Sequence, residues 1–237
     1  MGVPRARPGG AMYSTGMTNL TAPLRFEPFL RPVVWGGRRL ETVLDKRLPT
    51  ADSYGESWEI SDHPSHRTLL ATAPGCGMSL RDLMVRHRNE LLGPAASRCE
   101  TFPWLIKFLD ARDWLSVQVH PDDAGARTLC PGEGGKTEAW FILDASAGAR
   151  IWAGLKPGVT PDDLRRSLFD GTVVDRLHSF APKAGQCVFL PAGTVHAVGG
   201  GVLMAEIQQT SDATFRLFDW NRVDDQGKPR ALHIEQA

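Results

Sequence analysis

The second half of the chain alternates between short apolar segments and turns. From Pro103 onward, the turn residues Pro, Gly and Asp separate the segments WLIKFLDA, WLSVQVH, EAWFILDA, ARIWAGL, CVFLPAG and VLMAEIQQ. Many short strands with turn residues between them are typical of an antiparallel sandwich or barrel. We therefore expect residues 101–237 to form a mainly β domain.

Two segments carry a helical pattern instead. Ser79–Leu92 begins with a capping serine, and its apolar residues recur at three- and four-residue spacing, which predicts a helix. Thr160 is a second N-cap, because a proline and two acidic residues follow it, and this helix is expected to end near Gly171. We expect residues 22–100 to pack strands and a helix around the β domain. Residues 1–21 contain Gly, Pro and Arg and lack the apolar run of a secretory signal, and we expect them to be a disordered lead-in.

The composition excludes several classes of protein. The 27 Lys and Arg residues of this 237-residue chain balance its 27 Asp and Glu residues, so neither nucleic acid nor an anionic membrane is expected as a partner. The longest apolar runs are far shorter than the roughly 20 residues that cross a bilayer. Hydrophobic residues make up 42% of the chain, which excludes disorder throughout.

The cysteines indicate a reducing compartment. Cys76, Cys99, Cys130 and Cys187 stand far apart and form no C-x-x-C pair. A domain of this size does not need disulfides for stability, so we expect free thiols and a cytoplasmic location. Both a monomer and a small homo-oligomer are compatible with the sequence.

The most informative motif is GQCVFLPAGTVH, Gly185–His196. It matches the second motif of the cupin family, G-x5-P-x-G-x2-H, at every fixed position, and Gly200 stands where that motif usually continues to an asparagine. The resemblance implies a cupin-type jelly-roll barrel, with N-terminal strands and short helices packed around it. The turn would direct the imidazole of His196 into the barrel, and neutral imidazole is the commonest protein ligand for divalent metals.

Two further motifs supply partners for this histidine. Gln118 and His120 lie two residues apart in QVHPDD, as do Lys136 and Glu138 in KTEAW. On a strand, this spacing points both side chains of a pair to the same face. His120, Glu138 and His196 thus form a two-histidine, one-carboxylate set, which suits zinc with an open position and equally suits ferrous iron. His63 and His66, in SDHPSHR, are instead expected to be surface residues of a turn.

Several separated motifs together resemble the type I mannose-6-phosphate isomerases (phosphomannose isomerases) in their short bacterial form. These motifs follow one another along the chain as PVVWGGRRL, GESWEISDHP, PWLIKFLDARDWLSVQVHPDD, KTEAWFILDA, IWAGLKPGVT and the long segment from Gly185 to Arg222. Only Met1–Thr21 lies outside the resemblance. It implies a zinc-dependent interconversion of mannose 6-phosphate and fructose 6-phosphate, with one Zn²⁺ per chain and a phosphosugar as the substrate.

The resemblance also implies roles for individual residues. The family's zinc ligands fall on Gln118, His120, Glu138 and His196. Gln118 is either a fourth ligand or is replaced by water, since amides are weak zinc ligands. The residues near the sugar phosphate fall on Ser116 and Lys136.

The same resemblance places the family's catalytic arginine on Arg216 and a proton-transferring glutamate on Glu206. Moving a carbonyl from C1 to C2 removes a proton beside a carbonyl and passes through an enediolate, which a guanidinium can stabilise. Because Arg216 stays protonated near neutral pH, it is a fixed charge and not a base. Glu206 is either the base or a residue that orients substrate hydroxyls, and both roles remain open.

Two alternatives belong to other functional classes. A sugar-phosphate-binding cupin without activity would be indicated by the loss of Arg216, Glu206 or a metal ligand, and the sequence retains them all. A non-haem iron oxygenase could use the same ligand set. Lys136 and Arg216 fit an anionic, phosphorylated substrate better than they fit oxygen activation.

Overall fold

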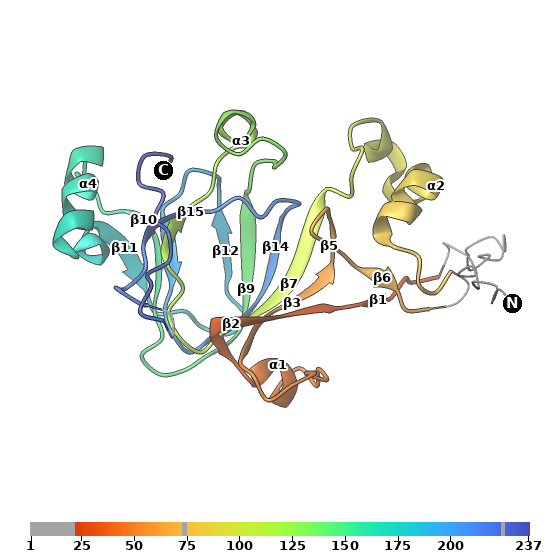
Figure 1. Ribbon diagram of the computed structural model, residues 1–237, viewed down its shortest axis with the longest axis horizontal. Helices are drawn as coiled ribbons and strands as arrows, with labels where there is room; N and C mark the ends of the chain where they lie inside the picture. The colour runs from red at the N-terminus through yellow and green to blue at the C-terminus, as the bar shows by residue number, and fades with distance from the viewer. Residues whose placement is uncertain (1–21, 73–74, 224–225) are drawn as a thin grey trace, which may run out of the picture.

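Two antiparallel sheets form the body of the protein (Figure 1). The computed structural model describes residues 22–72, 75–223 and 226–237, so the lead-in expected for residues 1–21 lies outside the described part. The six-stranded sheet has the order β12 (Cys187–Leu190), β9 (Glu138–Ala145), β14 (Val202–Gln209), β7 (Trp104–Ala111), β3 (Tyr54–Ile60) and β2 (Phe29–Gly37). The five-stranded sheet has the order β11 (Leu177–Phe180), β10 (Ile151–Leu155), β13 (His196–Val198), β8 (Val117–Val119) and β15 (Phe215–Phe218).

The main core lies between the inner faces of these sheets. Trp140, Ile142 and Met204 of the six-stranded sheet pack in one cluster with Ile151 and Val198 of the five-stranded sheet. Along β9, buried and more exposed residues alternate, as expected for a strand with one face in the core. The prediction of a mainly β, cupin-type fold is therefore confirmed, with the strands paired as two facing sheets.

Residues 22–100 contribute directly to the larger sheet. β3 pairs with β7 and carries β2 at the edge, so the N-terminal and C-terminal parts of the chain share one sheet. The short pairs β1 (Phe26–Glu27) with β6 (Leu69–Leu70), and β4 (Asp62–His63) with β5 (His66–Arg67), extend from this edge. The division of the chain at residue 100 stays a prediction.

Both predicted helices are confirmed. In α2 (Leu80–Leu92) and α4 (Pro161–Asp170), the hydroxyls of Ser79 and Thr160 accept the N–H of the acidic residue three positions on, whose carboxylate in turn accepts the N–H of the cap. α4 ends at Gly171, whose φ of 71° is left-handed. The two helices lie at opposite ends of the molecule (Figure 1).

Four shorter helical segments carry no apolar stripe that a sequence pattern could detect. They are α1 (Arg39–Thr42), α3 (Asp123–Leu129) and the 3₁₀ turns η1 (Gly93–Ser97) and η2 (Val173–Arg176). Each buries a single residue, such as Leu40 in α1 and Ala126 in α3, so no 3.6-residue periodicity develops. Within the described ranges, no helix combines the length and the apolar character needed to cross a bilayer.

The turn between β13 and β14 explains one departure from the cupin motif. A Cβ added at Gly200 would lie 2.6 Å from the carbonyl oxygen of Arg112, and one added at Gly199 would lie 2.6 Å from that of Arg150. Real Cβ atoms essentially never approach so closely. Glycine therefore stands at position 200, where the motif usually has asparagine, because neighbouring backbone fills the space.

Candidate active site

Three strands bring the predicted metal-binding side chains together. His120 directly follows β8, Glu138 begins β9 and His196 begins β13. One ligand atom from each lies within 4.8 Å of the others. The side chains are almost fully buried, with 2%, 2% and 1% of each residue exposed in that order. Residues separated by up to 76 positions in the sequence thus form one compact cluster in the space between the two sheets.

Hydrogen bonds fix the protonation of both imidazoles. Nδ1 of His120 lies 2.8 Å from the carbonyl oxygen of Ala213, and Nδ1 of His196 lies 2.9 Å from that of Thr194. A carbonyl only accepts, so each Nδ1 carries the proton and each Nε2 of the neutral ring presents a lone pair. Burial lowers the pKa of His196 to about 4 and lowers that of His120 well below its usual range, so both rings are neutral at pH 7.

The carboxylate of Glu138 faces these two lone pairs. Its Oε1 lies 3.2 Å from His196 Nε2, and its Oε2 lies 3.5 Å from His120 Nε2. The buried Oε1 accepts no hydrogen bond from the described residues. Acceptor atoms that face one another in a buried space are stable only with a cation or a hydrogen-bond donor among them. Two imidazoles and a carboxylate are a set that binds divalent metals, so these residues can hold a metal ion.

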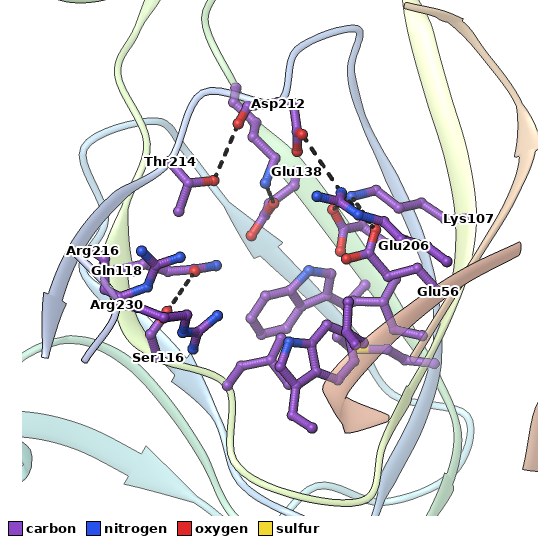
Figure 2. A pocket seen from close by; sticks show the side chains of 18 residues that line it. Glu56, Lys107, Ser116, Gln118, Glu138, Glu206, Asp212, Thr214, Arg216 and Arg230 are labelled. Carbon is purple, nitrogen blue, oxygen red and sulfur yellow. Dashed lines mark hydrogen bonds and ion pairs between the residues drawn. The ribbon is translucent and has the colours of Figure 1, made fainter. Parts of the chain in front are cut away.

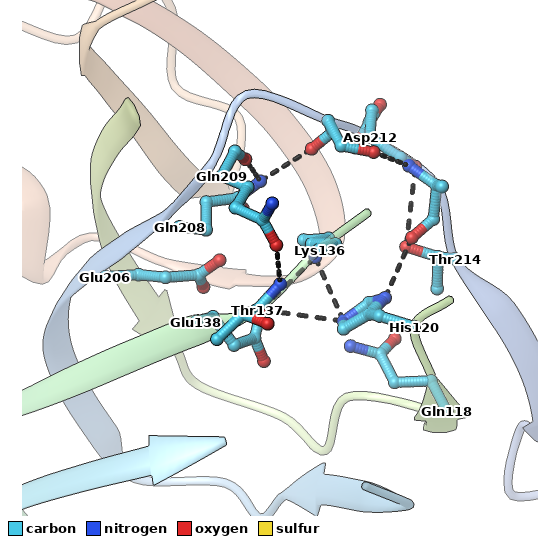
Figure 3. A network of polar contacts seen from close by, with 12 residues as sticks. Gln118, His120, Lys136, Thr137, Glu138, Glu206, Gln208, Gln209, Asp212 and Thr214 are labelled. Atoms are coloured by element: carbon cyan, nitrogen blue, oxygen red, sulfur yellow. Dashed lines mark hydrogen bonds and ion pairs between the residues drawn. The ribbon is translucent and has the colours of Figure 1, made fainter. Parts of the chain in front are cut away.

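Gln118 and Lys136 border the cluster. The amide Nε2 of Gln118 lies 3.2 Å from His196 Nε2. The ammonium of Lys136 donates to His120 Nε2 at 3.0 Å (Figure 3). Lys136 also lies 3.3 Å from Glu138 Oε2. Ser116 directly precedes β8, and its hydroxyl donates to the amide oxygen of Gln118. Ser116 and Lys136, predicted to bind substrate, therefore lie at different parts of the site.

A cavity of about 290 Å³ opens beside the cluster. It is lined by apolar side chains such as Trp35, Trp140 and Met204 and by many charged ones. Figure 2 shows Ser116, Gln118, Arg216 and Arg230 on one side of it, and Lys107, Glu206 and Glu56 on the other. This combination of an apolar wall with converging charged groups is typical of a site for a small polar molecule.

A buried ion-pair network forms the second side of the cavity. Lys107 of β7 pairs in register with Glu206 of β14, and its ammonium lies 3.4 Å from Glu206 Oε1 and 3.9 Å from Glu56 Oε2. Glu56 also accepts the indole N–H of Trp58 at 2.7 Å. Burial lowers the pKa of Lys107, but the nearby carboxylates, Glu206 and Glu56 foremost, together hold the pKa above its ordinary value. Burial raises the pKa of Glu206, against the opposing charge of Lys107.

The C-terminal segment holds Arg216 in place. The Arg216 guanidinium lines the cavity and donates through Nη1 to the carbonyl oxygen of Ala231 at 3.0 Å. Its backbone N–H donates to His233 Nδ1 at 3.1 Å, and the His233 N–H donates to the Arg216 carbonyl at 2.7 Å. The buried Nε–H of Arg216 has no partner within the described residues. A buried donor without a partner is costly unless a bound molecule satisfies it.

Residues 24–134 match a family described as phosphomannose isomerase type I, catalytic domain. Over 218 residues the chain is 41% identical to a mannose-6-phosphate isomerase of Streptococcus mutans, and the match covers 92% of this chain and 67% of the relative. The chain belongs to the type I phosphomannose isomerase family. The mannose-6-phosphate isomerase ManA of Bacillus subtilis is 37% identical over 217 residues, with 92% of this chain and 67% of ManA covered.

Solved structures of phosphomannose isomerases agree with this assignment. The crystal structure of a mannose 6-phosphate isomerase from Bacillus subtilis superposes with a TM-score of 0.84 at 36% identity, covering 91% of this chain and 67% of that one. A putative mannosephosphate isomerase from Archaeoglobus fulgidus superposes with a TM-score of 0.71 at 28% identity, covering 89% and 69% of the two chains. The family resemblance expected from the motifs is therefore confirmed.

The sequence motifs assign no role to several of the residues that line the cavity. Arg31, Lys107, Asp212, Thr214 and Arg230 all line the cavity and were not among the predicted site residues. Lys107 appears in the sequence as a lone cation in an apolar strand, and only the pairing of β7 with β14 places it beside Glu206. Arg230 lies in a segment with neither a helical nor a strand pattern.

The prediction for His63 was wrong, because this residue is buried rather than on the surface. Its Nδ1 lies 2.6 Å from the Ser65 hydroxyl, and its Nε2 lies 3.1 Å from Glu133 Oε1. Glu133 also accepts the Ser211 hydroxyl and the Asp212 N–H. No local pattern in the sequence indicates this contact, since Glu133 lies 70 positions away. His66 is half-buried and stacks on the ring of Phe29.

Proposed function

We propose that this chain interconverts mannose 6-phosphate and fructose 6-phosphate. The observation that carries the proposal is the buried cluster of His120, Glu138 and His196, since Glu138 lines a cavity that Arg216 and Glu206 also line. The relatives named as mannose-6-phosphate isomerases support the same reaction. A phosphosugar is accordingly the proposed substrate.

The proposed metal is zinc, one ion per chain, held by the Nε2 atoms of His120 and His196 and by the carboxylate of Glu138. When bound, the ion would polarise the substrate carbonyl as a Lewis acid and stabilise negative charge on its oxygen. Gln118 is proposed as a fourth ligand or as the neighbour of a ligating water. Its amide already lies at hydrogen-bonding distance from His196.

The proton transfer is proposed to depend on Glu206 and Arg216. Glu206 Oε1 accepts no hydrogen bond from the described residues, and the carboxylate lines the cavity, so it can take a proton from one carbon and return it to the next. Arg216 would donate to the oxygen that becomes negative in the enediolate. Lys136 and Ser116 are proposed to bind substrate, Lys136 beside the metal ligands and Ser116 at the other end of Gln118.

A cytoplasmic location is part of the proposal. All four cysteines are free in the structure, as expected in a reducing compartment. A phosphorylated sugar carries about two negative charges at neutral pH and is retained inside cells by that charge.

The experiment is a chelation and replacement series on the purified full chain. Mannose 6-phosphate is supplied, and fructose 6-phosphate is measured in a coupled assay before chelation, after chelation and after the return of zinc or iron. We expect activity that is lost with the chelator and restored by zinc, with one zinc per chain by elemental analysis. A zinc-loaded chain that binds the phosphosugar without converting it would instead indicate a binding protein, and oxygen consumption with iron would indicate an oxygenase.

A further inference from the structure

Arg230 reaches the cavity from the C-terminal segment. It lines the cavity together with Ser116, Gln118 and Arg216, and Figure 2 shows it on the same side as these residues. Asp219 holds its guanidinium through two hydrogen bonds, one of them from Nε to Oδ2 at 2.7 Å. The Asp219 carboxylate is itself buried, so the direction of the Arg230 fork is fixed.

The order of residues along two paired strands gives the cavity a direction. His120, Gln118 and Ser116 follow one another along β8 and the residues beside it, at intervals of about 7 Å. On β15, Arg216 is in register with Gln118, and Phe218 is in register with Val117. Asp219 comes directly after Phe218 and therefore lies level with Ser116. It is one such interval farther from His120 than Arg216 is. Arg230, anchored on Asp219, belongs to this far end.

The far end carries surplus positive charge. Three arginines, Arg216, Arg222 and Arg230, lie near Asp219. Among the described residues, Asp219 is the one carboxylate whose charge raises the pKa of Arg216. Burial, together with the positive charges of Arg230 and Arg222, lowers the pKa of Arg216. The Nε–H of Arg216 is also buried without a partner in the described part of the chain. On the opposite side, the positive charges of Lys107 and Arg31 are offset by Glu206 and Glu56. A dianion is therefore attracted to the end with the arginines.

We propose that Arg230, together with Ser116, binds the phosphate group of the substrate. The planar fork of an arginine matches the oxygens of a phosphate, and charge-assisted hydrogen bonds of this kind are the strong ones. The phosphate would lie at the far end and the reacting carbons at the metal ligands, with Arg216 between them. The placement of the phosphate at one end and the reacting carbons at the other rests on the proposed isomerase activity, whereas the anion-binding site at Arg230 does not.

The test compares Arg230→Gln with Arg222→Gln. Both arginines bind Asp219, but Arg222 donates to the Trp114 carbonyl and does not line the cavity, so it is the matched control. For metal-loaded Arg230→Gln we expect KM for mannose 6-phosphate to rise roughly 10-fold to 100-fold with kcat changed much less. The inhibition constant of inorganic phosphate should rise in parallel. Because Arg222 adds positive charge without lining the cavity, Arg222→Gln should change both constants much less than Arg230→Gln does.

Two further measurements keep the outcomes distinct. Arg230→Lys retains the charge without the fork and should give an intermediate KM, and thermal unfolding checks that all variants are folded. An unchanged KM and phosphate constant in folded Arg230→Gln, or an equal change in Arg222→Gln, would overturn the inference while the isomerase stands. If the parent chain does not isomerise, calorimetry with inorganic phosphate still decides: weakened binding in Arg230→Gln alone supports the anion site, and equal binding rejects it.

Discussion

Gln118 of β8 and His196 of β13 lie directly opposite each other, with the amide Nε2 of the first 3.2 Å from the imidazole Nε2 of the second. Since His196 Nδ1–H is already bound to the Thr194 carbonyl, the amide is the donor in this contact. Gln118 thus reaches the same lone pair that a metal ion would bind. The proposed role of Gln118, as a fourth ligand or as the neighbour of a ligating water, requires the amide to give up this contact when a metal binds.

Replacing His196 should remove the metal. In His196→Ala, one imidazole of the buried cluster is lost, and the residues that orient the ligands cannot replace it. The bound metal and the isomerase activity should therefore fall together, to less than about a tenth of the parent values. Elemental analysis and the coupled assay measure the two quantities. His178→Ala, which changes an exposed histidine, is the control and should keep both. Full metal content in His196→Ala would contradict the proposed ligand set.

Replacing Arg216 should separate activity from metal binding. Arg216→Ala keeps the backbone bonds to His233 but loses the donor that faces the cavity, so kcat should fall roughly 100-fold or more while the metal content stays constant. Arg150→Ala, a change of an exposed arginine bound to Ser179, is the matched control. An unchanged kcat in Arg216→Ala would assign this arginine a structural role only.

Local signals in the sequence account for much of the fold and for one part of the site. The two long helices begin at capping residues, and the turn before His196 has a fixed motif, so each could be predicted from about ten neighbouring residues. The position of Lys107 beside the cavity could not be predicted in this way, because it depends on the register of β7 against β14. His63 and Arg230 likewise depend on partners that distant or irregular segments supply.

The pairing of Lys107 with Glu206 predicts a stability effect that a double variant can isolate. In Lys107→Met, the buried carboxylate of Glu206 loses its cation and Glu56 keeps only Arg31, 3.6 Å away, so the free energy of unfolding should fall by about 3 kcal/mol. In Lys107→Met/Glu206→Gln, one of these charges is removed as well, so part of the loss should be recovered. Urea unfolding followed by tryptophan fluorescence measures both variants. Unchanged stability of Lys107→Met relative to the parent chain would show that the ion pair does not matter for folding, and equal losses in the two variants would show that the unpaired charge of Glu206 is not the cause.

The contact between His233 and Arg216 predicts that lowering the pH destabilises the C-terminal segment that contains Arg230. Nδ1 of His233 accepts the Arg216 N–H, which requires a neutral ring, and burial together with the charge of Arg216 lowers its pKa below the ordinary 6.5. A lowered pKa in the folded state means that this hydrogen bond stabilises the protein fully above pH 6.5 and is lost as the pH falls through the folded-state pKa.

The measurement for His233 is the difference in melting temperature between the parent chain and His233→Ala. Taking the difference cancels the other histidines, which titrate in both proteins. We expect the parent to melt higher at pH 8 and the difference to shrink steadily as the pH falls below 6.5. The imidazole proton shift of His233 in NMR spectra should titrate with a midpoint below 6.5. A difference that stays constant between pH 8 and pH 5 would mean that protonation of His233 does not disturb its contact with Arg216.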